Sequence, residues 1–262
     1  LIAYKPVADF EKQFNARDSG KYNTNIALFK TNNQQIEGHL GLWISKVRSL
    51  GINQYISDFG HVILKPYCEQ NFHPVFPMEE GQFIGKLIEG ASNMLKVTND
   101  FKLRPVLDKF VAIWLSTQAD NGYLGPGDKD KSWLIQDFYT QKYNMSGLLG
   151  YYEATDNLAA YNASKTIADL IMSRYSSSNI YNSHGYSFNA ASMALVPHFL
   201  DLFKYSGEQK YLDYCEYIFK NDEKNGLQLI SSLLDDGRVN QLIYIKGREL
   251  LANFAGIAKY YG

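Results

Sequence analysis

The chain has 262 residues, and its 26 Lys and Arg residues nearly balance 27 Asp and Glu residues, which gives a net charge of −1. Without a strong positive charge it lacks the attraction that supplies most non-specific affinity for nucleic acid, so we expect no nucleic-acid partner. An apolar content of 45% argues against a disordered chain, and no apolar run approaches the roughly 20 residues that span a bilayer, so we expect a soluble protein without membrane contact.

Residues 1–78 show little regular periodicity, and we interpret them as an irregular N-terminal segment with at least one helix. An amphipathic pattern predicts this helix from about Ile36 to Leu50. The short apolar run from His61 to Leu64 predicts a strand. Because the chain starts without a Met and stops where a helix is ending, we treat it as a possible fragment.

From residue 79 onward, a helix end, a polar turn and a second helix recur at intervals of about 50 to 57 residues. The turns lie at Thr98–Asp100, Thr155–Asn157 and Ser206–Glu208, and a fourth helix end lies at Tyr260–Gly262. Asn, Asp and Gly at these turns cap helices and tolerate left-handed backbone. Apolar residues precede every turn at helical spacing, and those ten and seven residues before the first three turns are Ile88 and Ala91, Met145 and Leu148, and Val196 and Phe199.

Hairpins of this length cannot bury their apolar faces alone and must stack on one another. The pattern therefore predicts an all-α fold for residues 79–262, either a solenoid or an α/α toroid of helical hairpins that forms a catalytic-like domain. We count about eight helices, and a closed toroid of about twelve needs more chain, so we expect the toroid to be incomplete here.

The densest polar cluster lies between residues 118 and 144, in and after a long loop. Aromatic faces combined with carboxylates and amides suit a sugar, whose C–H face packs on a ring while its hydroxyl groups need donors and acceptors. The alternative is that the aromatic residues form the hairpin core and that Asp137 is a helix cap. The substrate-binding candidates in this cluster are Asp120, Tyr123, Trp133, Tyr139 and Tyr143.

Three further candidates lie outside this cluster. His184, in a polar loop, is a candidate donor to a substrate hydroxyl, and Glu80 stands at the head of the first hairpin. Glu249 begins the last helix. Acidic residues also favour helix N-termini without any function, and Glu249 has Arg248 as an ion-pair partner. The other four histidines are too scattered to suggest ligands, and common metal, nucleotide and serine-hydrolase motifs are absent from the sequence, so carboxylate chemistry is the default.

An ordered series of motifs runs from residue 80 to the end of the chain. It comprises Glu80 with Gly85–Lys86, Asp120–Gly125, Trp133 with Asp137–Tyr139, Gly147–Leu149 with Tyr151–Thr155, and Ser206–Glu208 with Tyr211–Leu212. This series resembles the β-L-arabinofuranosidase family, glycoside hydrolase family 127, and its uncharacterised relatives, over roughly residues 79 to 262. The resemblance implies a six-hairpin toroid with β-sandwich additions and exo-acting hydrolysis of a sugar from glycans.

The resemblance also assigns individual positions. The family's Trp and its His-Glu-Leu-Tyr segment fall on Trp133 and Gln136–Tyr139, so the carboxylate falls on Asp137 and the histidine is missing. The family's Glu-x-Cys zinc-ligand pair falls on Glu249 and Leu251, so the carboxylate is present and the thiolate is not. Its nucleophilic cysteine pair would lie beyond Gly262. We therefore expect no metal and no other cofactor, although the resemblance alone implies zinc.

Neither cysteine of the chain occupies these family motifs. Cys68 lies in the N-terminal segment, and Cys215 lies in a repeat helix, where we expect a buried apolar role. Two cysteines also exclude a disulfide framework.

Three functions remain open at this point. The favoured one is a glycoside hydrolase acting on a carbohydrate substrate, in which Asp137 and Glu249 are catalytic, because one carboxyl group must protonate the leaving oxygen while the other attacks or activates water. The second is an unsaturated-uronyl hydrolase or polysaccharide lyase with a basic cleft, for which Lys142, Lys246 and Arg248 are available. The third is a non-catalytic helical-repeat module that binds carbohydrate or protein. The sequence carries no signal for a compartment.

Overall fold

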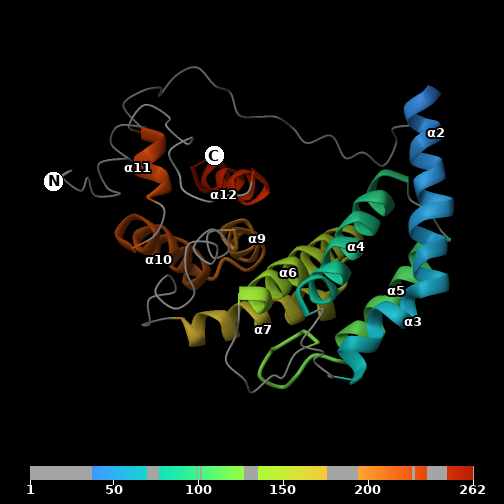
Figure 1. Ribbon diagram of the computed structural model, residues 1–262, viewed down its shortest axis with the longest axis horizontal. Helices are drawn as coiled ribbons and strands as arrows, with labels where there is room; N and C mark the ends of the chain where they lie inside the picture. The colour runs from blue at the N-terminus through green and yellow to red at the C-terminus, as the bar shows by residue number, and fades with distance from the viewer. Residues whose placement is uncertain are drawn as a thin grey trace.

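The computed structural model describes residues 37–69, 77–98, 100, 102–126, 135–175, 194–225, 228–234 and 247–261, and every regular element within these ranges is a helix. The all-α prediction is therefore confirmed. In chain order (Figure 1) the helices are α2 (Gly38–Lys46), the π-helix η2 (Val47–Asn53), α3 (Gln54–Glu69), α4 (Pro77–Thr98), α5 (Leu103–Leu115), α6 (Ile135–Thr155), α7 (Leu158–Arg174), α9 (Val196–Ser206), α10 (Gln209–Asn225), α11 (Leu229–Leu234) and α12 (Gly247–Tyr261).

The N-terminal region is more regular than its sequence indicates. The prediction of helix around Ile36 to Leu50 is confirmed, and this region consists of α2 followed by the π-helix η2. The predicted strand at His61–Leu64 is wrong, because these residues lie inside α3. Burial at helical spacing along α3 decides this outcome, and the buried positions are Ile56, Gly60, Leu64 and Tyr67.

The predicted hairpin turns are present, and local capping chemistry explains each of them. Asp156 has a φ of 57°, and the side chain of the next residue, Asn157, accepts a hydrogen bond from the backbone of Ala160 at the start of α7. Gly207 ends α9 with a φ of 69°. Asp100 accepts a 2.8 Å bond from the backbone N–H of Lys102 before α5. These polar groups replace the hydrogen bonds that helix ends lack.

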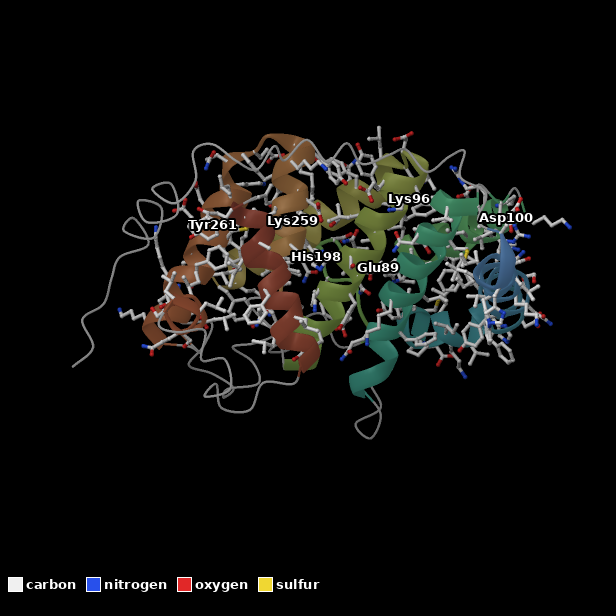
Figure 2. All side chains as sticks on the ribbon, turned by 90° about the horizontal axis from the view of Figure 1, so that it is seen from above. Glu89, Lys96, Asp100, His198, Lys259 and Tyr261 are labelled. Carbon is white, nitrogen blue, oxygen red and sulfur yellow. The ribbon has the colours of Figure 1, made fainter. Side chains whose placement is uncertain are left out.

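Four helices, α4, α6, α9 and α12, pack on one another in that order, and we call them the inner helices. Helices α5, α7 and α10 are their hairpin partners. Gly81 lies against Thr140 near the starts of α4 and α6, and Lys96 bonds to Glu153 at 2.7 Å near their ends. The two helices are therefore parallel, and Figure 2 shows α4 and α12 with their N-terminal ends on the same side of the molecule.

The same direction continues into α9 and α12. The Tyr205 hydroxyl, near the end of α9, donates to Glu153 near the end of α6 at 3.2 Å. Gly256 of α12 lies against Val196 at the start of α9, and Lys259 bonds to Asp201 one turn further along. All four inner helices thus begin at the same end of the hairpins.

Glycines bring α4 and α6 into direct backbone contact. A Cβ atom at Gly85 would collide with the carbonyl oxygen of Tyr143, and one at Gly147 would come within 2.6 Å of the carbonyl oxygen of Gly85. No side chain longer than hydrogen fits between the helices at these positions, so their spacing is set by the main chain itself.

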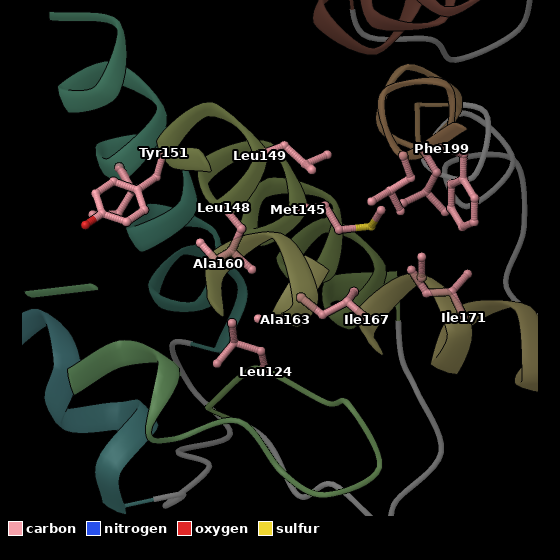
Figure 3. Close-up of a cluster of buried hydrophobic side chains, with 14 of the residues drawn as sticks. Leu124, Met145, Leu148, Leu149, Tyr151, Ala160, Ala163, Ile167, Ile171 and Phe199 are labelled. Atoms are coloured by element: carbon pink, nitrogen blue, oxygen red, sulfur yellow. The ribbon is translucent and has the colours of Figure 1, made fainter. Parts of the chain in front are cut away.

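The apolar core fills the space between inner helices and hairpin partners (Figure 3). The residues picked out by the repeat, Ile88, Ala91, Met145, Leu148, Val196 and Phe199, are all fully buried, so the predicted register is confirmed. Cys215 is also buried, and burial raises its pKa to about 12, as expected for an apolar role. In the described residues, none of the helices is both long and apolar enough for a membrane crossing.

Replacing Gly85 by Ala should lower the free energy of unfolding by about 1 to 3 kcal/mol, because the new methyl group must push α4 and α6 apart. Gly90→Ala in the same helix is the matched control. A Cβ there meets nothing within 4 Å, so the better helix propensity of Ala should stabilise the protein by up to about 1 kcal/mol. Urea denaturation followed by circular dichroism measures both, and equal effects would contradict the close contact.

Candidate functional site

The carboxylates singled out in the sequence lie at the starts of inner helices. Asp137 is the third residue of α6, Glu249 is the third residue of α12, and Glu80 is the fourth residue of α4. Because these helices are parallel, their first turns are at the same end of the molecule. The structure describes these three positions in the backbone only, and Trp133 and His184 lie outside the described residues.

The loop after α5 is held in place by hydrogen bonds to the neighbouring helices. The carbonyl oxygen of Leu124 accepts from Gln141 at 2.9 Å and from Asn144 at 2.6 Å, both on α6. Gln118 donates to the carbonyl oxygen of Ala163 on α7 at 3.0 Å. The loop is therefore fixed by the hairpin that follows it.

Asp120 is exposed on this loop and borders an open depression of about 380 Å³. Its lining comes from the end of α3 and the start of the loop, and consists of Tyr67, Cys68, Ser116, Thr117, Gln118, Ala119 and Asp120. None of the inner-helix carboxylate positions lines this depression. The structure therefore does not bring Asp120 together with the first turns of α6 and α12 through this feature.

Two of the predicted sugar-binding tyrosines are buried. Tyr123 is 2% exposed and belongs to the core, and Tyr143 is 9% exposed. The Tyr143 ring has the ammonium groups of Lys86 and Lys142 at 4.2 and 4.7 Å from its centroid, an arrangement that stabilises buried cations. Tyr139, on α6, is partly buried. A role of these rings in substrate binding stays a prediction.

The sequence does not single out His198, which is one of four histidines too scattered to suggest ligands. It lies in the first turn of α9, beside α6 and α12. Burial, followed by the positive charges of Lys142 and Lys259, lowers the pKa of His198 to about 3, so its ring is neutral at physiological pH. The residues next to His198 in the sequence do not indicate this environment, because both lysines come from helices distant in sequence.

The family model of the β-L-arabinofuranosidase GH127 catalytic domain matches residues 31–248. The chain belongs to this family. The match begins well before residue 79, so the family resemblance extends over the N-terminal helices α2 and α3 as well. No curated protein sequence matches this GH127 chain.

Two solved structures resemble the GH127 chain. One is Ara127N-Se, a GH127 β-L-arabinofuranosidase from Geobacillus stearothermophilus T6, with a TM-score of 0.58 and 15% identity. The alignment covers 72% of this chain and 32% of that structure. The other is the GH127 β-arabinofuranosidase BT3674, with a TM-score of 0.64, 16% identity, and coverage of 88% and 39% respectively. These likenesses support the toroid-type helical fold, and the chain spans 32% and 39% of the length of these two structures.

The described residues do not fit the zinc-thiolate centre that the family resemblance implies. They contain no group of three or more His, Cys, Asp or Glu side chains placed to hold a metal ion. Leu251, at the family's cysteine position, is 68% exposed and offers no donor. Cys68 is exposed on α3 and Cys215 is buried on α10, and neither belongs to an inner helix.

The lowered pKa of His198 makes folding stability depend on pH. In the unfolded chain His198 is protonated below about pH 6.5, whereas in the folded chain it is protonated only below about pH 3. Between these pH values the unfolded chain binds one more proton, so acidification favours unfolding. Between pH 7 and 5, the wild type should lose about 2 kcal/mol more unfolding free energy than His198→Gln. Urea denaturation at both pH values measures this difference. His61→Gln, an exposed position on α3, is the control that should keep the wild-type slope, and an unchanged slope in His198→Gln would contradict a buried neutral ring.

Proposed function

We propose that the chain is a glycoside hydrolase that releases a terminal sugar from a glycan, with arabinofuranosides as the first substrates to test. The observation that carries this proposal is the placement of Asp137 and Glu249 in the first turns of two parallel inner helices, α6 and α12. These are the two positions at which the family resemblance expects a carboxylate. Both related structures are arabinofuranosidases, which supports the choice of sugar.

The helix starts suit the chemistry of a pair of carboxyl groups. Unpaired backbone N–H groups and the helix dipole favour negative charge in the first turn, which supports a carboxylate that attacks or activates water. Glycoside hydrolysis needs such a group together with a carboxyl group that protonates the leaving oxygen. Rigid helices also hold catalytic groups more precisely than loops do.

We also propose that hydrolysis requires no zinc bound through thiolates of this chain. The support is the donor set, since Leu251 stands where the family has a cysteine, and Cys68 and Cys215 lie on other elements. Carboxyl groups of Asp137 and Glu249 supply both proton transfer and nucleophilic assistance in this proposal, and no step passes through a metal.

Asp137→Asn and Glu249→Gln should each lower nitrophenol release from nitrophenyl β-L-arabinofuranoside by at least about 100-fold, because an amide neither donates a catalytic proton nor carries the negative charge. Initial rates measured by absorbance give the comparison, and circular dichroism checks the helices. Asp213→Asn, exposed on the hairpin partner α10, is the control and should keep wild-type activity. Full turnover in both active-site variants would refute their assignment.

Dialysis of the full chain against a chelator should leave this hydrolysis within about twofold of the untreated rate, because the proposed mechanism draws only on carboxyl groups. Rates before dialysis, after dialysis and after zinc is added back provide the measurement. A loss of activity that zinc restores would show that a metal takes part and would reject the carboxylate-only mechanism.

A further inference from the structure

The open depression beside Asp120 lies where two neighbouring helices end. Helices α3 and α5 pack against each other (Figure 1). Tyr67 and Cys68 from the last turn of α3, together with residues 116–120 after α5, line a space of about 380 Å³. We call this space the Asp120 depression. Its volume lies within the range of about 300 to 1,000 Å³ that is usual for small-ligand pockets.

The polar side chains that follow α5 offer mainly hydrogen-bond acceptors to this space. The hydroxyl groups of Ser116 and Thr117 each donate, at 2.7 Å, to carbonyl oxygens in the last turn of α5. The amide nitrogen of Gln118 donates to the carbonyl oxygens of Gly122 and Ala163, each at 3.0 Å. Because the protein itself already uses these hydrogens, the capacity that remains is that of the oxygen lone pairs.

Asp120 makes the Asp120 depression negative. Its carboxylate is exposed, and no described residue forms a hydrogen bond or ion pair with it. No other residue that lines the depression carries a charge at neutral pH. The C-terminal ends of α3 and α5 add their partial negative charges, because both helices end here. The depression therefore repels anions.

This combination of groups selects the ligand. Acceptor oxygens beside a carboxylate bind most strongly to a molecule that brings several hydrogen-bond donors and no negative charge. Calcium takes six to eight oxygen ligands, among which carboxylates are prominent, whereas the lining supplies a single carboxylate. A neutral sugar presents several hydroxyl donors on one rigid ring, and these match acceptors carried by neighbouring residues.

The Asp120 depression lies at the same end of the molecule as the proposed catalytic carboxylates. The hydroxyl of Tyr67 donates to the carbonyl oxygen of Gly81, near the start of α4, at 2.7 Å. The same hydroxyl accepts from the amide of Asn144 on α6 at 3.2 Å. Asp137 precedes Asn144 by seven residues, which corresponds to about 10 Å along the helix axis.

We propose that the Asp120 depression is a subsite for a neutral sugar unit of the glycan, whose hydroxyl groups donate to Asp120, Ser116 and Thr117. The subsite binds a part of the glycan away from the bond that is cleaved, because the catalytic positions do not line the depression. Its place within a glycan rests on the proposed glycoside hydrolase function. It follows that the enzyme prefers a neutral glycan to one that carries a uronic acid at this unit.

Alkylation of Cys68 by iodoacetamide tests the subsite, because this thiol is exposed in the lining and the other cysteine, Cys215, is buried. L-arabinose and D-galactose should each slow the alkylation of the full chain to a plateau at least about threefold below the free rate, since a bound sugar blocks access to the thiol. D-galacturonate differs from galactose by the carboxylate at C6 and should protect far less. Mass spectrometry gives the rates.

The other outcomes of this experiment would overturn the inference. Absence of protection by both neutral sugars would show that no sugar binds, and equal protection by galacturonate would show that the negative lining selects nothing. Calcium chloride that protects Cys68 while the sugars do not would show a cation site. Glycerol that protects as well as the sugars would show a general solvent effect on the thiol.

Asp120→Ala should raise the sugar concentration for half-maximal protection about tenfold, which is the effect of one lost hydrogen bond to a charged group. Asp213→Ala on α10 is the matched control and should be protected as the wild type is. Both positions are exposed, so both variants should fold, and circular dichroism checks this. Unchanged protection in Asp120→Ala would reject the subsite.

Arabinofuranoside hydrolysis measured on the same wild-type samples separates the two proposals. Hydrolysis by a chain in which no neutral sugar protects Cys68 would reject the subsite and keep the proposed function. Protection that depends on Asp120, in a chain that hydrolyses no glycoside, would reject the activity and keep the sugar-binding site.

Discussion

The backbone contact between α4 and α6 determines where the other inner helices can lie. Gly85 and Gly147 leave no side chain between the two helices, so the pair can neither rotate nor slide without a collision of main-chain atoms. Helix α9 then packs on α6 through the Tyr152 and Tyr205 rings, whose centroids are 5.3 Å apart. Helix α12 packs on α9 through Gly256. The direction of α9 and α12 therefore follows from that of the first pair.

Polar contacts complete this arrangement without contributing much stability of their own. Lys96, Glu153 and Tyr205 link the ends of α4, α6 and α9, but the lysine and the glutamate are partly exposed, and such pairs contribute at most about 1 kcal/mol. These contacts help to fix the relative direction of the helices, because they join the C-terminal ends of all three. Stability comes mainly from the buried apolar residues between the inner helices and their partners.

Features encoded by neighbouring residues could be predicted from the sequence, and features that depend on distant packing could not. The turns at Asp156 and Gly207 depend on local capping and on left-handed backbone, and they were found. The run from His61 to Leu64 is too short to distinguish a strand from a helix, and only its burial inside α3 decides. The burial of Tyr123 in the core likewise depends on packing that its neighbours in the sequence do not reveal. The charges that act on His198 come from two other helices, so no sequence motif around it indicates the lowered pKa.

The helix turns that make the closest contact between inner helices are not the turns that carry the acidic residues. Asp137 lies in the first turn of α6, whereas the contact with Gly85 is made by Tyr143, nearly two turns later. A substitution at the head of the helix therefore changes charge and proton affinity while the framework keeps its geometry. Proteins that share this framework can therefore exchange the residues at the helix starts and still fold, so one helical scaffold can carry different sets of chemical groups.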